Sequence, residues 1–233
     1  MLEEVDSTNA EALRQADELD GPCWILARRQ TAGRGRRGRA WADPPGNFAA
    51  SLAMRLDEPP ARMALRSFVA ALALRDALCA LTGLGDAFTL KWPNDVLVNG
   101  GKLSGILLET GPQGLLVVGI GVNLRAAPPA DAEALFSPVA LHAETGITLD
   151  AETLLDHLAP AFARWEDRLR REGFAPLRAA FLAHAARLGE RIEARTPSVT
   201  RAGRFETIDA SGALVLATRE GHVTVPAADI FFP

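Results

Sequence analysis

The 233-residue sequence contains only two cysteines, Cys23 and Cys79. This number excludes a disulfide framework, and also a zinc site built from cysteines, which needs a larger set of Cys and His ligands. No apolar stretch approaches the roughly 18 residues that a membrane span requires. Residues 2–6 are largely acidic, unlike the basic and then apolar start of a signal peptide. We therefore expect a cytoplasmic protein without disulfides or membrane contact.

The sequence also lacks an excess of positive charge. It has 25 Lys and Arg against 29 Asp and Glu, a net charge of -4, which argues against a general nucleic-acid coat but leaves room for a local basic site. With 48% hydrophobic and 23% charged residues, the composition is that of an ordinary globular protein. The length predicts one large domain, with or without a small appendage.

The hydrophobic pattern up to residue 187 alternates between helices and strands. A capping box formed by Thr8 and Glu11 predicts a first helix that runs to about Gly21. Short apolar runs between turn residues predict strands over residues 23–27, 47–56, 89–92 and 115–123, and a hairpin over 96–109 that turns at 99–101. Longer runs with helical spacing predict helices over residues 61–82 and 150–187, the second interrupted at Pro160 and near Gly173.

From Gly189 onward the pattern changes to short β-like pieces separated by turn residues. This change predicts a small β-barrel of about 45 residues. We therefore expect one domain over residues 1–187 and a second over residues 188–233.

The most unusual segment covers residues 28–39, with six arginines, three glycines and no acidic residue. Guanidinium groups bind phosphate or carboxylate oxygens, and the glycines let the backbone approach a ligand. A solvated basic turn or an RNA-contacting arm is the alternative. However, the segment is internal and lacks the interleaved aromatics of a single-strand nucleic-acid platform. The pattern favours a small ligand that carries phosphate.

A second candidate region joins residues 91–95, Lys-Trp-Pro-Asn-Asp, to residues 102–105, Lys-Leu-Ser-Gly. Pro93 ends a strand, and Asn94 and Asp95 follow where the chain turns back, a common place for functional groups. A structural Asx turn explains this pair about as well. Lys102 opens the second strand of the predicted hairpin, beside small residues that leave room for a flat ligand.

Five segments in this order resemble the biotin protein ligases. They are residues 6–9 (DSTN), 30–41 (QTAGRGRRGRAW), 91–95 (KWPND), 102–109 (KLSGILLE) and 119–123 (GIGVN). The resemblance implies an α/β (α+β) fold, with a mixed-sheet catalytic domain similar to class II aminoacyl-tRNA synthetases and biotin/lipoate ligases, followed by an SH3-like β-barrel. Bifunctional members carry a helix-turn-helix domain before the ligase. Only five residues precede Asp6, so the resemblance implies a ligase that does not bind DNA.

The family's reaction has two steps. Biotin and ATP, assisted by Mg²⁺, form biotinyl-5′-AMP and pyrophosphate, and a lysine of the biotin carboxyl carrier protein of acetyl-CoA carboxylase, or of a related carboxylase, then attacks the mixed anhydride. No enzyme nucleophile is required, which agrees with the lack of a Ser/His/Asp or Cys/His constellation. The resemblance also allows a homodimer.

The resemblance assigns roles to individual residues. The expected biotin-binding residues are Ser7, Thr8, Asn9, Gln30, Gly33, Arg34, Gly35, Arg36, Lys102, Ser104 and Gly105. The expected ATP-binding residues are Arg36, Arg39, Trp41, Asn94, Lys102 and Asn123. Lys102 and Arg36 are the expected catalytic residues, because Lys102 would offset negative charge at the α-phosphate and Arg36 belongs to the loop that orders over the adenylate. Asp95 either helps to hold Mg²⁺ or has an internal hydrogen-bonding role.

Two other functions remain open at this point. A lipoate protein ligase shares the fold and the adenylate strategy, but its different glycine-rich signature is not visible here. A nucleic-acid-binding module that uses the arginine segment would bind with a steep dependence on salt.

Overall fold

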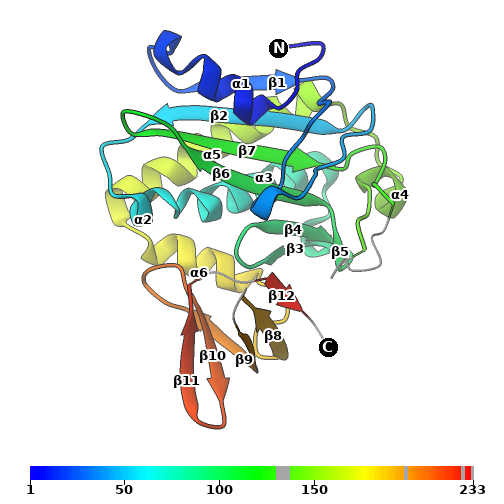
Figure 1. Cartoon of the computed structure of the whole chain (residues 1–233). Helices are drawn as coiled ribbons and strands as arrows, with labels where there is room; N and C mark the ends of the chain where they lie inside the picture. The colour runs from blue at the N-terminus through cyan, green and yellow to red at the C-terminus, as the bar shows by residue number, and fades with distance from the viewer. Residues whose placement is uncertain (130–136, 197–198, 227–228, 232–233) are drawn as a thin grey trace.

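The computed structural model describes residues 1–129, 137–196, 199–226 and 229–231. Its central sheet has four antiparallel strands in the order β1 (Cys23–Ala27), β2 (Phe48–Arg55), β7 (Leu115–Val122) and β6 (Ser104–Thr110) (Figure 1). Isolated parallel bridges join Leu2 to Ala27 and Val5 to Gln30. These bridges place the start of the chain beside the end of β1 and give the sheet its mixed character.

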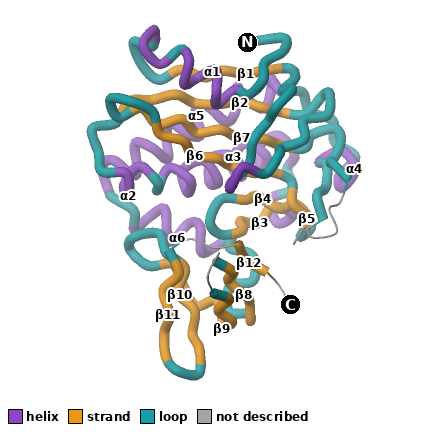
Figure 2. The backbone as a smooth tube through the Cα atoms, viewed as in Figure 1, coloured by secondary structure: helices purple, strands orange, loops and turns teal. Residues whose placement is uncertain are grey.

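Helices cover one face of this sheet (Figures 1 and 2). They are α3 (Arg66–Thr82) and α5 (Ala151–Glu172), with α2 (Pro60–Met63) and α6 (Ala175–Ala183) beside them. Alternate residues of β7, Leu116, Val118 and Ile120, point to this side and join the main apolar core. This face is packed with large aliphatic side chains along its whole length.

The opposite face is built differently. Leu115 and Val117 of β7 pack there in a small apolar cluster with Ala12 of helix α1 (Thr8–Arg14). The next residues of the same strand with this orientation are Gly119 and Gly121. Beyond α1, this strand therefore presents backbone instead of side chains.

A three-stranded sheet lies next to the central one and contains β3 (Phe88–Lys91), β4 (Asp95–Val98) and β5 (Gly101–Lys102). Asn99 and Gly100 make the turn with φ of 50° and 82°, the geometry of a two-residue hairpin loop. The prediction that this hairpin continues to Glu109 is wrong, because the chain crosses at the fully buried Leu103 and pairs with β7 as β6. Lys102 therefore lies where the two sheets meet.

Three of the predicted helices differ in detail, and the first of them, α1, ends at Arg14 instead of near Gly21. The helix predicted over residues 61–82 is divided into α2 and α3, and α5 continues through Pro160 instead of breaking there. The proline is exposed, while Leu158 and Phe162 on either side of it are buried in the core, and this packing holds the helix together despite the lost N–H. The remaining short elements are η1 (Ala16–Glu18), η2 (Arg36–Gly38), η3 (Gly85–Ala87) and α4 (Leu141–Thr145).

The C-terminal region forms a five-stranded antiparallel sheet in the order β11-β10-β9-β8-β12. Its strands are β8 (Arg191–Arg195), β9 (Thr200–Ile208), β10 (Leu214–Thr218), β11 (Gly221–Val225) and β12 (Asp229–Phe231). The Trp92 indole N–H donates to the Gly212 carbonyl at 2.9 Å and joins this sheet to the residues that follow β3. The predicted fold class is confirmed, while the domain boundary at residue 188 stays a prediction. Within the described ranges no helix is long and apolar enough to cross a bilayer.

Candidate active site

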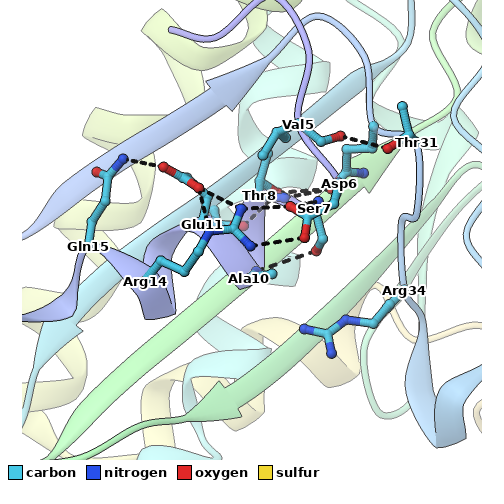
Figure 3. Close-up of polar contacts among 12 residues, drawn as sticks. Val5, Asp6, Ser7, Thr8, Ala10, Glu11, Arg14, Gln15, Thr31 and Arg34 are labelled. Carbon is cyan, nitrogen blue, oxygen red and sulfur yellow. Dashed lines mark hydrogen bonds and ion pairs between the residues drawn. The ribbon is translucent and has the colours of Figure 1, made fainter.

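The N-cap of helix α1 lies one residue before the predicted one. Ser7 is the N-cap, and its Oγ accepts from the backbone N–H three residues on at 3.5 Å, so the prediction that Thr8 caps the helix is wrong. Glu11 instead accepts from Arg14, which also pairs with Asp6 (Figure 3). The hydrogen bond from Arg14 is the main cause that lowers the pKa of Asp6 to about 2. The Thr8 hydroxyl is left for contacts inside the protein.

Thr8 belongs to a buried hydrogen-bond network on the glycine side of the central sheet. Its N–H donates to Gln30 Oε1 at 2.9 Å, and its hydroxyl lies 2.7 Å from that of Ser51. Ser51 in turn lies 2.6 Å from Asn9 Oδ1, and Asn9 Nδ2 donates to Glu109 at 2.8 Å. Thr8, Asn9 and Ser51 are almost completely buried. The network therefore joins helix α1 to strands β2 and β6.

Glycines of β6 and β7 receive the side chains that lie over this face. An added Cβ at Gly121 would lie 2.6 Å from the Trp41 ring, and one at Gly105 would lie 3.0 Å from it. At Gly119 it would lie only 2.1 Å from the Asn9 amide oxygen. Larger residues at these positions would displace Trp41 or Asn9, so the glycines are required by close approach.

The arginine segment folds back on itself as a short hairpin. The Gly35 N–H donates to the Arg39 carbonyl at 2.7 Å, and the Trp41 N–H donates to the Gly33 carbonyl at 2.9 Å, with η2 between them. A Cβ at Gly33 would lie 2.6 Å from the Trp41 carbonyl oxygen. This hairpin places Trp41 against the sheet and exposes Arg39.

Two arginines of this hairpin reach the body of the protein. Arg34 extends over the sheet (Figure 3) and pairs with Glu109 at 3.2 Å, while Arg36 donates to Asn94 Oδ1 at 3.4 Å. The Asn94 amide N–H also donates to the Ile106 carbonyl of β6. Asn94 thus joins the arginine hairpin to the boundary between the two sheets.

Asp43 closes the base of the same segment. Its Oδ2 accepts from the Gln30 N–H at 2.9 Å, and its Oδ1 is buried without a hydrogen-bond partner among the described residues. Burial raises the pKa of Asp43, and the hydrogen bonds from Gln30 offset only part of that rise.

Asp95 lies between two lysines at the meeting point of the sheets. Its Oδ1 is 2.9 Å from Lys102 Nζ and its Oδ2 is 3.1 Å from Lys91 Nζ. Burial alone would raise the pKa of Asp95, but the positive charges of Lys102 and Lys91 outweigh it and lower the pKa to about 2. The side chain of Lys102 is 32% exposed, whereas those of Asp95 and Lys91 are each 9% exposed. The cluster has a net charge of +1, and Lys102 carries it toward solvent.

Asp95 does not fit the role of a magnesium ligand in this arrangement. Both of its oxygens face ammonium groups, and a cation would have to displace them. No group of three or more His, Cys, Asp or Glu side chains suited to a metal ion occurs in the described part of the chain. The geometry favours the internal role for Asp95 that the sequence left as an alternative.

The backbone around Lys102 is held by Asn123 and Ser104. The Lys102 N–H donates to the Ser137 carbonyl, and the Lys102 carbonyl accepts from the Val139 N–H, each at 3.0 Å. Asn123 Nδ2 donates to the Val139 carbonyl at 3.1 Å, and Ser104 Oγ accepts a backbone N–H of β4 at 3.3 Å. Asn123 Oδ1 is buried without a partner among the described residues.

Comparison with known proteins shows to which family the chain is related. Residues 2–124 match the model of the Biotin/lipoate A/B protein ligase family, and residues 188–232 match the Biotin protein ligase C terminal domain. A biotin–[acetyl-CoA-carboxylase] ligase of Paracoccus denitrificans is 53% identical over 100% of this chain and 99% of its own length. The chain belongs to the biotin protein ligase family. This ligase is also 34% identical to a biotin–[acetyl-CoA-carboxylase] ligase of Mycobacterium tuberculosis, over 99% of this chain and 87% of the other.

The fold agrees with solved biotin protein ligases. The structure of the Aquifex aeolicus enzyme in complex with biotin and ATP superposes with a TM-score of 0.85, at 26% identity, over 98% of this chain and 95% of that one. In the present ligase, hydrogen bonds and close contacts join most of the predicted site residues into one region. Ser7 is the exception, since its hydroxyl caps α1. The individual ligand roles of these residues stay predictions.

Four further residues of this biotin protein ligase were missed from the sequence as site residues. Ser51 and Glu109 belong to the network around Asn9, Asp43 holds Gln30, and Lys91 completes the cluster around Asp95. Ser51 had a weak signal, because it is the one hydroxyl-bearing residue inside the apolar strand β2. Lys91 lies four residues from Asp95 in a segment that the sequence had singled out, whereas Asp43 and Glu109 have partners that only the tertiary structure brings close.

Proposed function

We propose that the protein activates biotin with ATP as biotinyl-5′-AMP and transfers the biotinyl group to a lysine of a biotin carboxyl carrier protein. One observation carries the proposal: the polar network of Thr8 and Asn9 and the Trp41 ring lie over one glycine-lined face, and the net-positive Lys102 cluster lies where that sheet meets the next one. Such a site can receive a polar ring, a nucleobase and a phosphate together. The similarity to ligases named for acetyl-CoA carboxylase supports the choice of acceptor.

In the first step, a carboxylate oxygen of biotin attacks the α-phosphorus of ATP, and the bond to pyrophosphate breaks. Lys102 would offset the negative charge that develops on the α-phosphate oxygens. Arg36 would bind the same phosphate from the loop, and Trp41 would stack on adenine. Mg²⁺ is expected to arrive on the ATP phosphates, and no protein ligand to it is assigned.

In the second step, a neutral lysine amine of the carrier attacks the carbonyl carbon of the mixed anhydride. An amide forms, AMP leaves with the bonding electrons, and the proton that the amine nitrogen loses passes to solvent. The ligase would contribute mainly by positioning the two reactants and by excluding water. We expect this reaction in the cytoplasm, without a requirement for DNA or membrane, and sedimentation of the purified protein would test for a homodimer.

Pyrophosphate exchange tests the proposed function directly. Purified protein is incubated with ATP, Mg²⁺ and labelled pyrophosphate, together with biotin, with lipoate, or with neither. Exchange with biotin alone, followed by labelling of a carboxyl carrier domain but not of its Lys→Arg variant, is the expected result. Exchange with lipoate alone would identify a lipoate ligase. Steeply salt-dependent binding to nucleic acid, without exchange, would favour the binding-module alternative.

A further inference from the structure

In the buried network on the glycine face, the contact with Glu109 at one end decides which group donates and which accepts in each hydrogen bond. Glu109 Oε2 lies 2.8 Å from Asn9 Nδ2, and a carboxylate can only accept. The Leu107 carbonyl, 3.4 Å from the same nitrogen, is also an acceptor. The Asn9 amide is therefore oriented with its NH₂ toward Glu109 and its oxygen toward Ser51.

This orientation decides which hydroxyl donates to which. Ser51 Oγ lies 2.6 Å from Asn9 Oδ1 and 2.7 Å from Thr8 Oγ1. Serine has a single hydroxyl hydrogen, and an amide oxygen can only accept, so Ser51 donates to Asn9. The contact between the two hydroxyls must then be donated by Thr8.

Thr8 Oγ1 consequently has acceptor capacity but no hydrogen left to offer. Gln30 Oε1, which accepts the Thr8 backbone N–H at 2.9 Å, lies 3.2 Å from the hydroxyl as a second acceptor for the same hydrogen and cannot supply one. Within the described ranges, no other donor lies within hydrogen-bond distance of Thr8 Oγ1. A ligand group that hydrogen-bonds to Thr8 must bring an N–H or O–H of its own.

We propose that Ser51 and Asn9 are positioning residues that hold the Thr8 hydroxyl as an acceptor, and thereby select a ligand ring with an N–H at this place. The inference rests on the proposed function, because the ureido ring of biotin has an N–H on each side of its carbonyl. Asn9 Oδ1 and Nδ2 already have protein partners, so in this proposal Asn9, which the sequence predicts to bind biotin directly, acts through Thr8, as Ser51 does. Glu109, which fixes the orientation of Asn9, also pairs with Arg34 at 3.2 Å, so one carboxylate serves both the network and the arginine hairpin.

The test compares biotin with two cyclic carbamate analogues, in each of which one ureido N–H is replaced by a ring oxygen. Affinities are measured by calorimetry without ATP, for wild type and Ser51→Ala. In wild type, one of the two analogues should bind about tenfold to a hundredfold more weakly than biotin, since its ring oxygen would face an acceptor. In Ser51→Ala the Thr8 hydroxyl can turn and donate, so this ratio should fall at least about fivefold.

Matched variants make the outcome specific. Thr8→Val should abolish the discrimination, and adding Ser51→Ala to it should change nothing further, because the two act in series. Ser67→Ala, which removes a hydroxyl bonded only to the Ala64 carbonyl, should leave the ratio at the wild-type value. Ser51→Cys, with its weak donor, should lower the ratio if Ser51→Ala does not fold.

Two results would overturn different claims. Unchanged ratios for both analogues in Ser51→Ala that still binds biotin would reject the positioning role and leave the proposed function intact. Wild-type protein that neither binds biotin nor exchanges pyrophosphate with it would reject both.

Discussion

Two buried ionic clusters of this protein have opposite composition. In the site, one carboxylate, Asp95, lies between the two ammonium groups of Lys91 and Lys102. In the helical layer, one guanidinium, Arg66, lies between the carboxylates of Glu58 and Glu166. The three groups of the first cluster sum to +1 and those of the second to -1, which Arg62 balances from the surface at 3.5 Å from Glu58. The two clusters differ even more in the solvent exposure of their central and outer charges.

Arg66 is fully buried, and its Nε and both terminal nitrogens contact the two glutamates, with the Arg62 carbonyl as a further acceptor. It joins α3 to α5 and to the segment before α2, and it presents nothing to a ligand. In the other cluster, the partly exposed Lys102 can offer its ammonium group to an incoming anion. The comparison indicates that a buried cluster acts as a brace when its charges are enclosed, and as a site when one excess charge faces outward.

Breaking the brace should have the largest effect. Arg66→Ala leaves the buried Glu166 without its partner, while Glu58 keeps only Arg62, and should destabilise the fold by about 3 to 5 kcal/mol, measured by urea unfolding. Arg62→Ala is the matched control, because that side chain is half exposed and its contact with the same Glu58 is 3.5 Å. It should stay within about 0.5 kcal/mol of wild type. Equal stability of the two variants would contradict the brace.

Removing the partly exposed charge of the site should affect catalysis more than folding, because Asp95 loses one lysine partner but keeps Lys91. Lys102→Ala should slow adenylate formation by about tenfold to more than a hundredfold, because a charge-assisted hydrogen bond contributes roughly 1.5 to 3 kcal/mol. Pyrophosphate exchange gives the rate, and thermal unfolding gives the stability. Arg29→Ala, an exposed arginine paired with Glu4, is the control for lost charge. Wild-type exchange by folded Lys102→Ala would reject the assignment.

The pH dependence of the unfolding free energy tests the ionic pairing of Asp95. Its pKa is lowered from 3.8 to about 2 in the folded protein, so its contribution is complete above about pH 5 and disappears as the pH falls toward 2. Asp95→Asn should therefore be less stable than wild type by roughly 2 kcal/mol at pH 7. The difference in unfolding free energy between the two proteins should shrink between pH 5 and pH 2. A difference that stays constant over this range would argue against the ionic pairing.

In the arginine hairpin, unlike in the two buried clusters, the charges lie on a loop. If the hairpin acts as a lid over the adenylate, Arg36→Gly should still form biotinyl-5′-AMP but release it about tenfold faster, since one charge-assisted contact is lost. Released adenylate would acylate lysines of a bystander protein without a carrier domain. Rapid-dilution dissociation rates and bystander labelling measure the effect. Equal values for mutant and wild type would leave the arginines as static phosphate contacts.

Local patterns predicted the regular elements well. The bounds of β1 agree with the prediction to the residue, because an apolar run between a turn and a charged segment leaves little choice. The hairpin over 96–109 was wrong because sheet membership after Leu103 depends on pairing with β7, which is distant in sequence. Pro160 predicted a break that the packing of Leu158 and Phe162 prevents.

In the site, too, the sequence did not predict contacts between residues that are distant along the chain. Short motifs singled out Lys102, Asp95 and Thr8, because each lies in a segment of unusual composition. Ser51 lies in an ordinary strand sequence and Glu109 ends the segment 102–109, and both become part of the site only when β2 and β6 are placed beside α1. Sequence patterns therefore located the region, while the direction of its hydrogen bonds required the fold.

The Asp95 cluster also determines where the chain can react as an amine. Lys91 and Lys102 are the only two lysines in the 233 residues, and both contact the same carboxylate. Every other permanently cationic side chain is an arginine, which acylating reagents modify far less readily than an amine. Once the α-amine of Met1 is blocked, an amine-directed label will therefore report on this one cluster.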